Sequence, residues 1–116
     1  MKVLIIEDNR DAAESLRLLL ELRGHHVTLA ESGAAGLEAA RQGLPEVVLC
    51  DLALPGMDGF AVAVALRQDP RTAAARLIAV TGYGHDDDLQ RGRAAGFDMH
   101  VLKPIDPGEL ERLLAG

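Results

Sequence analysis

The chain has 116 residues, of which 48% are apolar, and it carries a formal net charge of −6. This length is typical of a single domain, residues 1–116, with enough apolar side chains for a core. The negative charge argues against nucleic acid as a direct partner, since phosphate binding needs a basic face, and no run approaches the roughly 20 apolar residues of a membrane span. The single cysteine, Cys50, cannot form an internal disulfide, and no signal peptide begins the chain, so a cytoplasmic protein is expected.

Short apolar runs rich in β-branched residues alternate with helical segments along the whole chain. Continuous apolar runs of this kind are typical of strands buried on both faces. The predicted strands are residues 3–6, 26–30, 47–50, 77–80 and 99–102. The predicted helices lie between Asn9 and Gly24, over 33–42 and 59–68, between Asp86 and Gly96, and from Pro107 to the end. Gly82-Tyr83-Gly84 is expected to be a mobile loop.

Small polar residues and glycines predict where these helices begin and end. Asn9 or Asp8, Ser32 and Asp58 are placed to cap the first three helices, because their side chains can accept hydrogen bonds from free N–H groups in the first turn. Gly24 is expected to adopt the left-handed conformation that commonly follows a helix, and Gly43 is expected to end the second helix.

Five strands that alternate with five helices predict an α/β fold, a doubly wound five-stranded parallel sheet. Right-handed crossovers leave few strand orders, and the order 2-1-3-4-5 makes the first and third strands neighbours. The carboxyl ends of parallel strands meet at one edge, where ligands bind in such sheets. Glu7 and Asp8 are therefore expected to lie beside Asp51, although more than 40 positions separate them.

The residues that end the strands form a chemically specific set: Glu7, Asp8, Asp51, Thr81 and Lys103. Clustered carboxylates repel one another unless a cation intervenes, and oxygen ligands suit Mg²⁺. A lysine and a hydroxyl can contact phosphate oxygens, and a carboxylate can form an aspartyl phosphate. The set therefore predicts a site that receives a phosphoryl group on an aspartate.

The sequence resembles the receiver domain of two-component response regulators over its whole length. The resemblance rests on Ile5-Ile6-Glu7-Asp8-Asn9, the run from Asp51 to Gly59, Thr81-Gly82 and Lys103-Pro104 in this order. It implies the flavodoxin-like (βα)5 fold with the strand order given above. The stretch from Thr81 to Pro104 is most similar to receivers of hybrid sensor kinases, so a parent hybrid kinase and a stand-alone regulator are both open as origins.

The resemblance implies a role for each matching residue. Asp51 is the expected phosphoacceptor, and a histidine kinase or histidine phosphotransfer protein is the expected donor. Mg²⁺ is expected on Asp8, Asp51 and Glu7 and on the backbone carbonyl of Ala53. The remaining implied roles are phosphoryl contact by Lys103, a switch movement of Thr81 and a cis bond before Pro104. Such a domain catalyses its own phosphorylation and dephosphorylation and turns over no separate substrate.

Two residues are less settled at this stage. The switch position three residues before Lys103 usually carries Phe or Tyr in this family, whereas here it is His100, which predicts altered or pH-sensitive switching. Leu18 lies among acidic residues on the polar face of the first helix, where it is either a partner-docking residue or an ordinary exposed leucine.

Three other readings compete with a phosphoacceptor module. A Mg²⁺-dependent phosphohydrolase commonly needs a general acid two residues after the nucleophile, where this chain has Ala53. A flavin-binding protein of this fold lacks the necessary Ser/Thr-rich loop here. A phosphorylation-independent interaction scaffold stays the alternative, and the complete set of acids, threonine and lysine argues against it.

Overall fold

A computed structural model describes residues 1–82 and 86–115, the side chain of Asp86 excepted. Five strands alternate with five helices in chain order: β1 (Lys2–Ile6), α1 (Arg10–Leu22), β2 (His26–Ala30), α2 (Gly33–Gly43), β3 (Val47–Asp51), α3 (Gly59–Gln68), β4 (Arg76–Thr81), α4 (Asp86–Ala95), β5 (Met99–Leu102) and α5 (Pro107–Ala115). All five predicted strands and all five predicted helices are present. Of the expected loop 82–84, Tyr83 and Gly84 lie outside the described residues.

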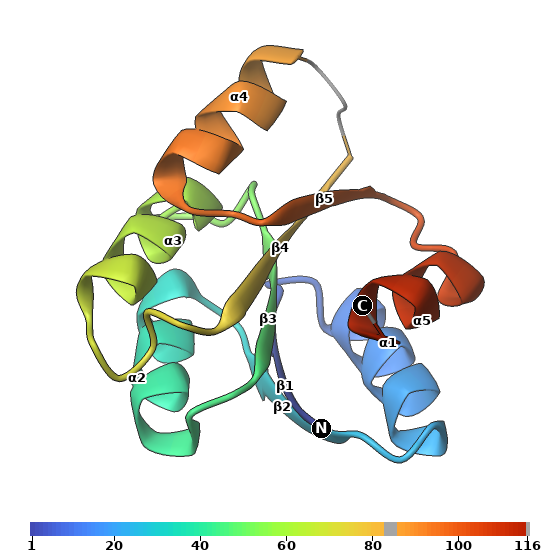
Figure 1. Cartoon of the computed structure of the whole chain (residues 1–116). Helices are drawn as coiled ribbons and strands as arrows, with labels where there is room; N and C mark the ends of the chain where they lie inside the picture. Colours follow the sequence, from blue (N-terminus) through green and yellow to red (C-terminus); the bar gives the residue numbers. More distant parts are fainter. Residues whose placement is uncertain (83–85, 116) are drawn as a thin grey trace.

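The strands form one parallel sheet in the order β2-β1-β3-β4-β5, which confirms the predicted topology. Helices α1 and α5 cover one face of the sheet, and α2, α3 and α4 cover the other (Figure 1). The central strand β3 is buried along its whole length because it has a neighbour on each edge and helices on both faces. Its continuous apolar run is what such a position requires.

The two faces of the sheet pack into separate cores. Leu4, Ile6 and Val48 pack in one core with residues of α2 and α3, whereas Val3 and Ile5 pack in the other with residues of α1 and α5. This division follows from the period of two along a strand, which sends successive side chains to opposite faces. Within the described part of the chain, no helix is long and apolar enough to cross a membrane.

The first three helices begin where the sequence predicts. The side chains of Asn9, Ser32 and Asp58 accept hydrogen bonds from the third residue of each following helix. Gly24 follows α1 in the left-handed conformation, with φ 88°. The predicted end of α2 is wrong by one residue, because Gly43 is still helical and Leu44 adopts the left-handed conformation, with φ 49°. The Leu44 N–H still reaches the carbonyl of Ala40, so the helix end is satisfied without glycine.

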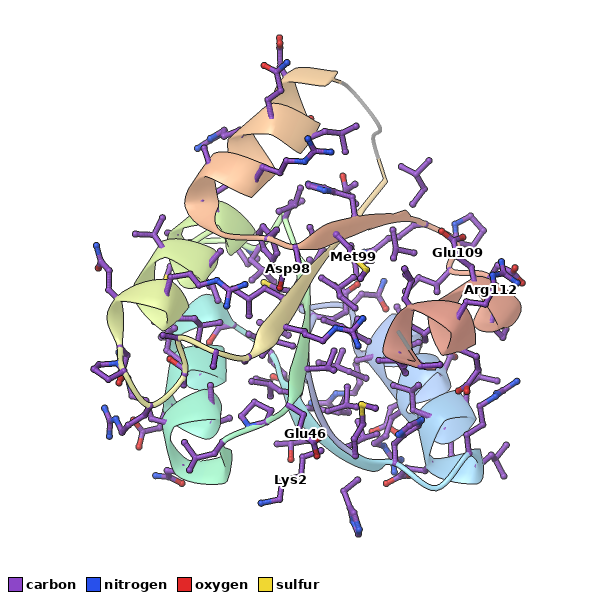
Figure 2. All side chains as sticks on the ribbon, in the orientation of Figure 1. Lys2, Glu46, Asp98, Met99, Glu109 and Arg112 are labelled. Carbon is purple, nitrogen blue, oxygen red and sulfur yellow. The ribbon has the colours of Figure 1, made fainter. Side chains whose placement is uncertain are left out.

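Arg67 on α3 forms hydrogen bonds to the segment before β4 and to the turn between α4 and β5. Its guanidinium donates hydrogen bonds to the carbonyls of Ala73, Ala75 and Gly96 and to the carboxylate of Asp98. Asp98 lies at the turn that leads into β5 (Figure 2) and also accepts from the Leu77 N–H. This network joins α3 to the start of β4 and to the turn between α4 and β5.

Candidate phosphoryl and metal site

The strand register brings the predicted site residues to one edge of the sheet. Ile6 pairs with Cys50 across β1 and β3, so Glu7 and Asp51 follow side by side. Thr81 pairs with Leu102 across β4 and β5, so Lys103 follows one residue beyond. The Lys103 N–H also donates to the Thr81 carbonyl at 2.8 Å, which extends the ladder past the end of the strands.

The Lys103 ammonium bridges two buried carboxylates. Its Nζ donates to Oε1 of Glu7 at 2.6 Å and to Oδ2 of Asp51 at 2.7 Å. The carboxylate side chains are only 8% and 7% exposed, whereas Lys103 is 34% exposed. Two buried anions therefore share one partly exposed cation, and one of the three ammonium hydrogens is left for a further acceptor. The peptide bond between Lys103 and Pro104 is cis.

Backbone N–H groups hold both carboxylates in place. The Ala53 N–H donates to Oδ1 of Asp51 at 2.9 Å, and the Asn9 N–H donates to Oε2 of Glu7 at 3.2 Å. The β3–α3 loop folds tightly enough for Gly59 to donate to the Leu52 carbonyl at 3.1 Å. Each oxygen of the two carboxylates thus has a fixed donor, which orients the remaining lone pairs.

The sequence analysis missed Gly59 as a residue that shapes the site. A Cβ at this position would lie 2.5 Å from the Asp51 carbonyl oxygen, which is closer than real Cβ contacts allow. The start of α3 can therefore approach the end of β3 only because this residue has no side chain. The signal was present in the sequence, since a glycine in the first helical turn is otherwise unfavourable.

The two buried carboxylates titrate differently. Burial raises the pKa of Glu7 above its ordinary value, and the neighbouring Asp51 adds to the rise despite the hydrogen bond from Lys103. Burial also acts to raise the pKa of Asp51, but hydrogen bonds from Lys103 and the Ala53 N–H outweigh it and lower this pKa. Those same two carboxylates raise the pKa of Lys103 against the effect of its burial. Asp51 therefore stays ionised at neutral pH, as a nucleophile must.

Three carboxylates converge closely enough to hold one metal ion. Glu7, Asp8 and Asp51 each offer an oxygen, and these oxygens lie within 4.8 Å of one another. Asp8 is exposed, whereas Glu7 and Asp51 are buried, so one side of the cluster is open to water. A hard cation that keeps several water ligands suits this donor set, and Mg²⁺ is such a cation.

An apolar cavity extends from this cluster beneath α1. Its volume is about 480 Å³, and its lining includes Leu16, Leu49 and Ile105 together with Glu7, Asp51 and Lys103 at one end. The carboxylates thus border apolar residues on one side and the exposed Asp8 on the other. The apolar side keeps water from Glu7, and this burial raises its pKa.

Leu18 and His100 lie away from the carboxylate cluster, whereas Cys50 and Thr81 adjoin it in the sheet. Leu18 is 54% exposed on α1, and His100 on β5 packs under α4. Cys50 is fully buried, and burial raises the pKa of its thiol, so it is the core residue that the sequence predicts. Thr81 is buried at the end of β4.

Comparisons with known proteins agree with this geometry. Residues 3–115 match the family model of the response regulator receiver domain. The chain is 36% identical over 105 residues to the protein PilH of Pseudomonas aeruginosa, covering 90% of this chain and 87% of that protein. It is also 37% identical to the transcriptional regulatory protein AfsQ1 of Streptomyces coelicolor, covering 89% of this chain but 44% of that protein.

Solved structures share the fold, and one of them holds a magnesium ion. A putative response regulator from Chloroflexus aurantiacus superposes with a TM-score of 0.92 at 33% identity, covering 97% of this chain and 93% of that one. The receiver domain of a sensor histidine kinase from Pseudomonas aeruginosa, with a magnesium ion coordinated in its active-site cleft, superposes with a TM-score of 0.90 at 26% identity and the same coverage.

The chain belongs to the response regulator receiver domain family. It is a receiver of two-component signalling, and its acidic pocket of Glu7, Asp8 and Asp51 fits the phosphoaspartate site of such domains. Receiver domains bind Mg²⁺ in this pocket, take their phosphoryl group from a histidine kinase, and are not enzymes with a separate substrate.

Proposed function

We propose that Asp51 is the phosphoacceptor of this receiver and that the chain, residues 1–116, acts as one receiver unit. The observation that carries the proposal is the Lys103 ammonium, which contacts Asp51 at 2.7 Å and Glu7 at 2.6 Å beside a third carboxylate. In the reaction, an Asp51 oxygen bonds to phosphorus as the bond between phosphorus and the donor histidine nitrogen breaks. The lowered pKa of Asp51 keeps this oxygen available at neutral pH.

Lys103 and Thr81 would receive the transferred group. Lys103 already faces the Asp51 carboxylate, so a small shift of its Nζ places it on a phosphoryl oxygen. Thr81 ends the neighbouring strand, and its carbonyl is tied to the Lys103 N–H. We propose that Thr81 moves toward the phosphoryl group and that His100, on the strand that directly precedes Lys103, completes the switch.

The proposed Mg²⁺ ligands are Asp8, Asp51, Glu7 and the carbonyl oxygen of Ala53, with Asp8 holding the ion more directly than Glu7. The ion, when bound, would offset the negative charge of the transferred phosphoryl group. The contribution of the chain itself is orientation: the Ala53 N–H fixes one oxygen of Asp51, and Asn9 fixes one oxygen of Glu7.

We propose a histidine kinase or histidine phosphotransfer protein in the cytoplasm as the donor. Leu18 is the proposed docking residue, since it is an exposed apolar side chain on the helix that follows Asp8. A hybrid sensor kinase is the proposed parent, supported by the motifs from Thr81 to Pro104 and by the likeness to the receiver of a sensor histidine kinase. The relatives PilH and AfsQ1 represent other contexts for a receiver.

Intact-mass spectrometry after incubation with acetyl phosphate and Mg²⁺ tests the proposal. A phosphoryl adduct is expected on the natural chain, and Asp51→Asn or EDTA should abolish it. Because rapid hydrolysis can hide an adduct, binding of beryllofluoride is measured in parallel by NMR. If neither an adduct nor a beryllofluoride response is found, the proposal fails and a phosphorylation-independent scaffold of the same fold takes its place.

A further inference from the structure

The imidazole of His100 occupies space that a side chain at residue 92 would fill. His100 lies on β5, opposite Ala79 of β4, and Gly92 lies on α4. A Cβ built on Gly92 would lie 2.3 Å from Nε2 and 2.8 Å from Cε1 of His100. Real Cβ atoms essentially never approach other atoms within 3.0 Å. We call this space, which lies beside the backbone of Gly92 and is filled by the His100 ring, the Gly92 notch.

Packing holds the ring in the notch. The Nε2 atom is buried, and the described part of the chain offers it no hydrogen-bond partner. The ring of Phe97, at the end of α4, lies 6.2 Å away at a tilt of 57°. A buried polar atom without a partner is unfavourable, because the ring nitrogen gives up a hydrogen bond that water would supply.

We propose that Gly92 is a positioning residue for the switch of this receiver, because its missing side chain allows His100 to pack beneath α4. This inference rests on the proposed switch role of His100. It adds that the ring position depends on α4, since a side chain at residue 92 would fill the space that the ring occupies. Lys103, which is hydrogen-bonded to Asp51, follows three residues later, directly after β5.

The charged groups around the ring make its position sensitive to pH. Burial lowers the pKa of His100, and the nearby Arg93 lowers it further, whereas Asp88 opposes the shift. Both residues lie on α4. In the turn before β5, Asp98 is already bound to Arg67, and the neighbour of His100 on β4 is the apolar Ala79. Protonation therefore favours the ring outside the notch.

NMR titration of the His100 ring is the direct test, with a His100→Gln variant to assign its resonances. Gly92→Ala should move the ring out of the notch, so its pKa should rise toward the ordinary value of about 6.5 and its protons should lose the ring-current shift from Phe97. Gly108→Ala is the matched control, because a Cβ there meets nothing closer than 3.6 Å. An unchanged His100 titration in Gly92→Ala would overturn the proposal.

A double-mutant cycle keeps the proposal testable if Gly92→Ala folds poorly. In a His100→Ala background the notch is empty, so Gly92→Ala should increase the equilibrium constant for folding about fivefold through helix propensity alone. With His100 present this gain should disappear or reverse. An equal gain in both backgrounds would show that the two residues do not interact, and the proposal would fall.

The two proposals fail separately. If acetyl phosphate labels Asp51 but the cycle shows no coupling, the phosphoacceptor stands and the notch does not position the switch. If the coupling is found but Asp51 accepts no phosphoryl group and the chain ignores beryllofluoride, the packing of His100 stands and the phosphoacceptor proposal fails, together with the switch role assigned to Gly92.

Discussion

Replacing Arg67 with methionine should test what holds α4 and β5 in position. Methionine keeps most of the aliphatic stem of Arg67 but removes every hydrogen bond of the guanidinium. These bonds run to the carbonyls of Ala73, Ala75 and Gly96 at 2.6–2.9 Å and to the Asp98 carboxylate at 2.8 Å. They connect segments that are separated by up to 31 positions in the chain.

The expected loss follows from the number and burial of these bonds. Hydrogen bonds to a charged group contribute about 1.5–3 kcal/mol each when buried, but several here share one side chain and water can partly replace them. Because the Arg67 side chain is only 25% exposed, we expect the free energy of unfolding to fall by about 3–4 kcal/mol. A domain with roughly 5–15 kcal/mol of stability would stay folded.

Urea unfolding monitored by circular dichroism measures this loss. Arg71→Met is the matched control, since Arg71 pairs with Asp69 at 2.8 Å but its side chain is 61% exposed. Exposed ion pairs contribute little, so the control should leave the urea midpoint nearly unchanged. If Arg67→Met lowers the midpoint no more than Arg71→Met does, the reasoning that this network joins α3, α4 and β5 is wrong.

Three further changes probe the site and the sheet. Burial holds the pKa of Glu7 above its ordinary value of 4.5, so the folded state loses stability as Glu7 ionises with rising pH. In EDTA, the free energy of unfolding of Glu7→Gln should therefore depend less on pH above 4.5 than that of the natural chain. The same variant should bind Mg²⁺ more weakly in calorimetry. Gly59→Ala should cost about 1–3 kcal/mol in urea unfolding, because the new Cβ meets the Asp51 carbonyl; a cost no greater than that of Gly108→Ala would contradict the close approach. Arg76→Gln removes the hydrogen bonds that Arg76 donates to the last carbonyls of α5, so hydrogen exchange of the α5 amides should accelerate about fivefold. Unchanged exchange would show that Arg76 does not stabilise the end of α5.

Much of the fold follows from local sequence patterns. The run Val47–Asp51 is apolar until its last residue, which is what a central strand of a parallel sheet requires, and the structure buries all five residues. Asn9 and Asp58 begin their helices as predicted because capping depends on side chains within three residues of the cap. The end of α2 could not be predicted as well, since Leu44 adopts a conformation that its own preferences disfavour.

The candidate site was predicted in composition but not in its contacts. That Glu7, Asp51 and Lys103 share one edge follows from the strand order, because each residue ends or follows a parallel strand. Lys103 bridges both carboxylates, and the pKa of Asp51 is lowered while that of Glu7 is raised. These contacts depend on side-chain positions that no local pattern specifies.

The sequence alone determined the strands, the helix starts and the residues available at the carboxyl edge, because hydrophobic period and capping act over a few positions. Only the tertiary structure decided that residue 59 must be glycine beside the Asp51 carbonyl and that Gly92 makes room for His100. Both depend on how closely two different elements approach, since Gly59 of α3 meets the backbone of β3 and Gly92 of α4 meets a side chain of β5. Such distances are set by the packing of whole helices against the sheet, and local preferences carry no information about them.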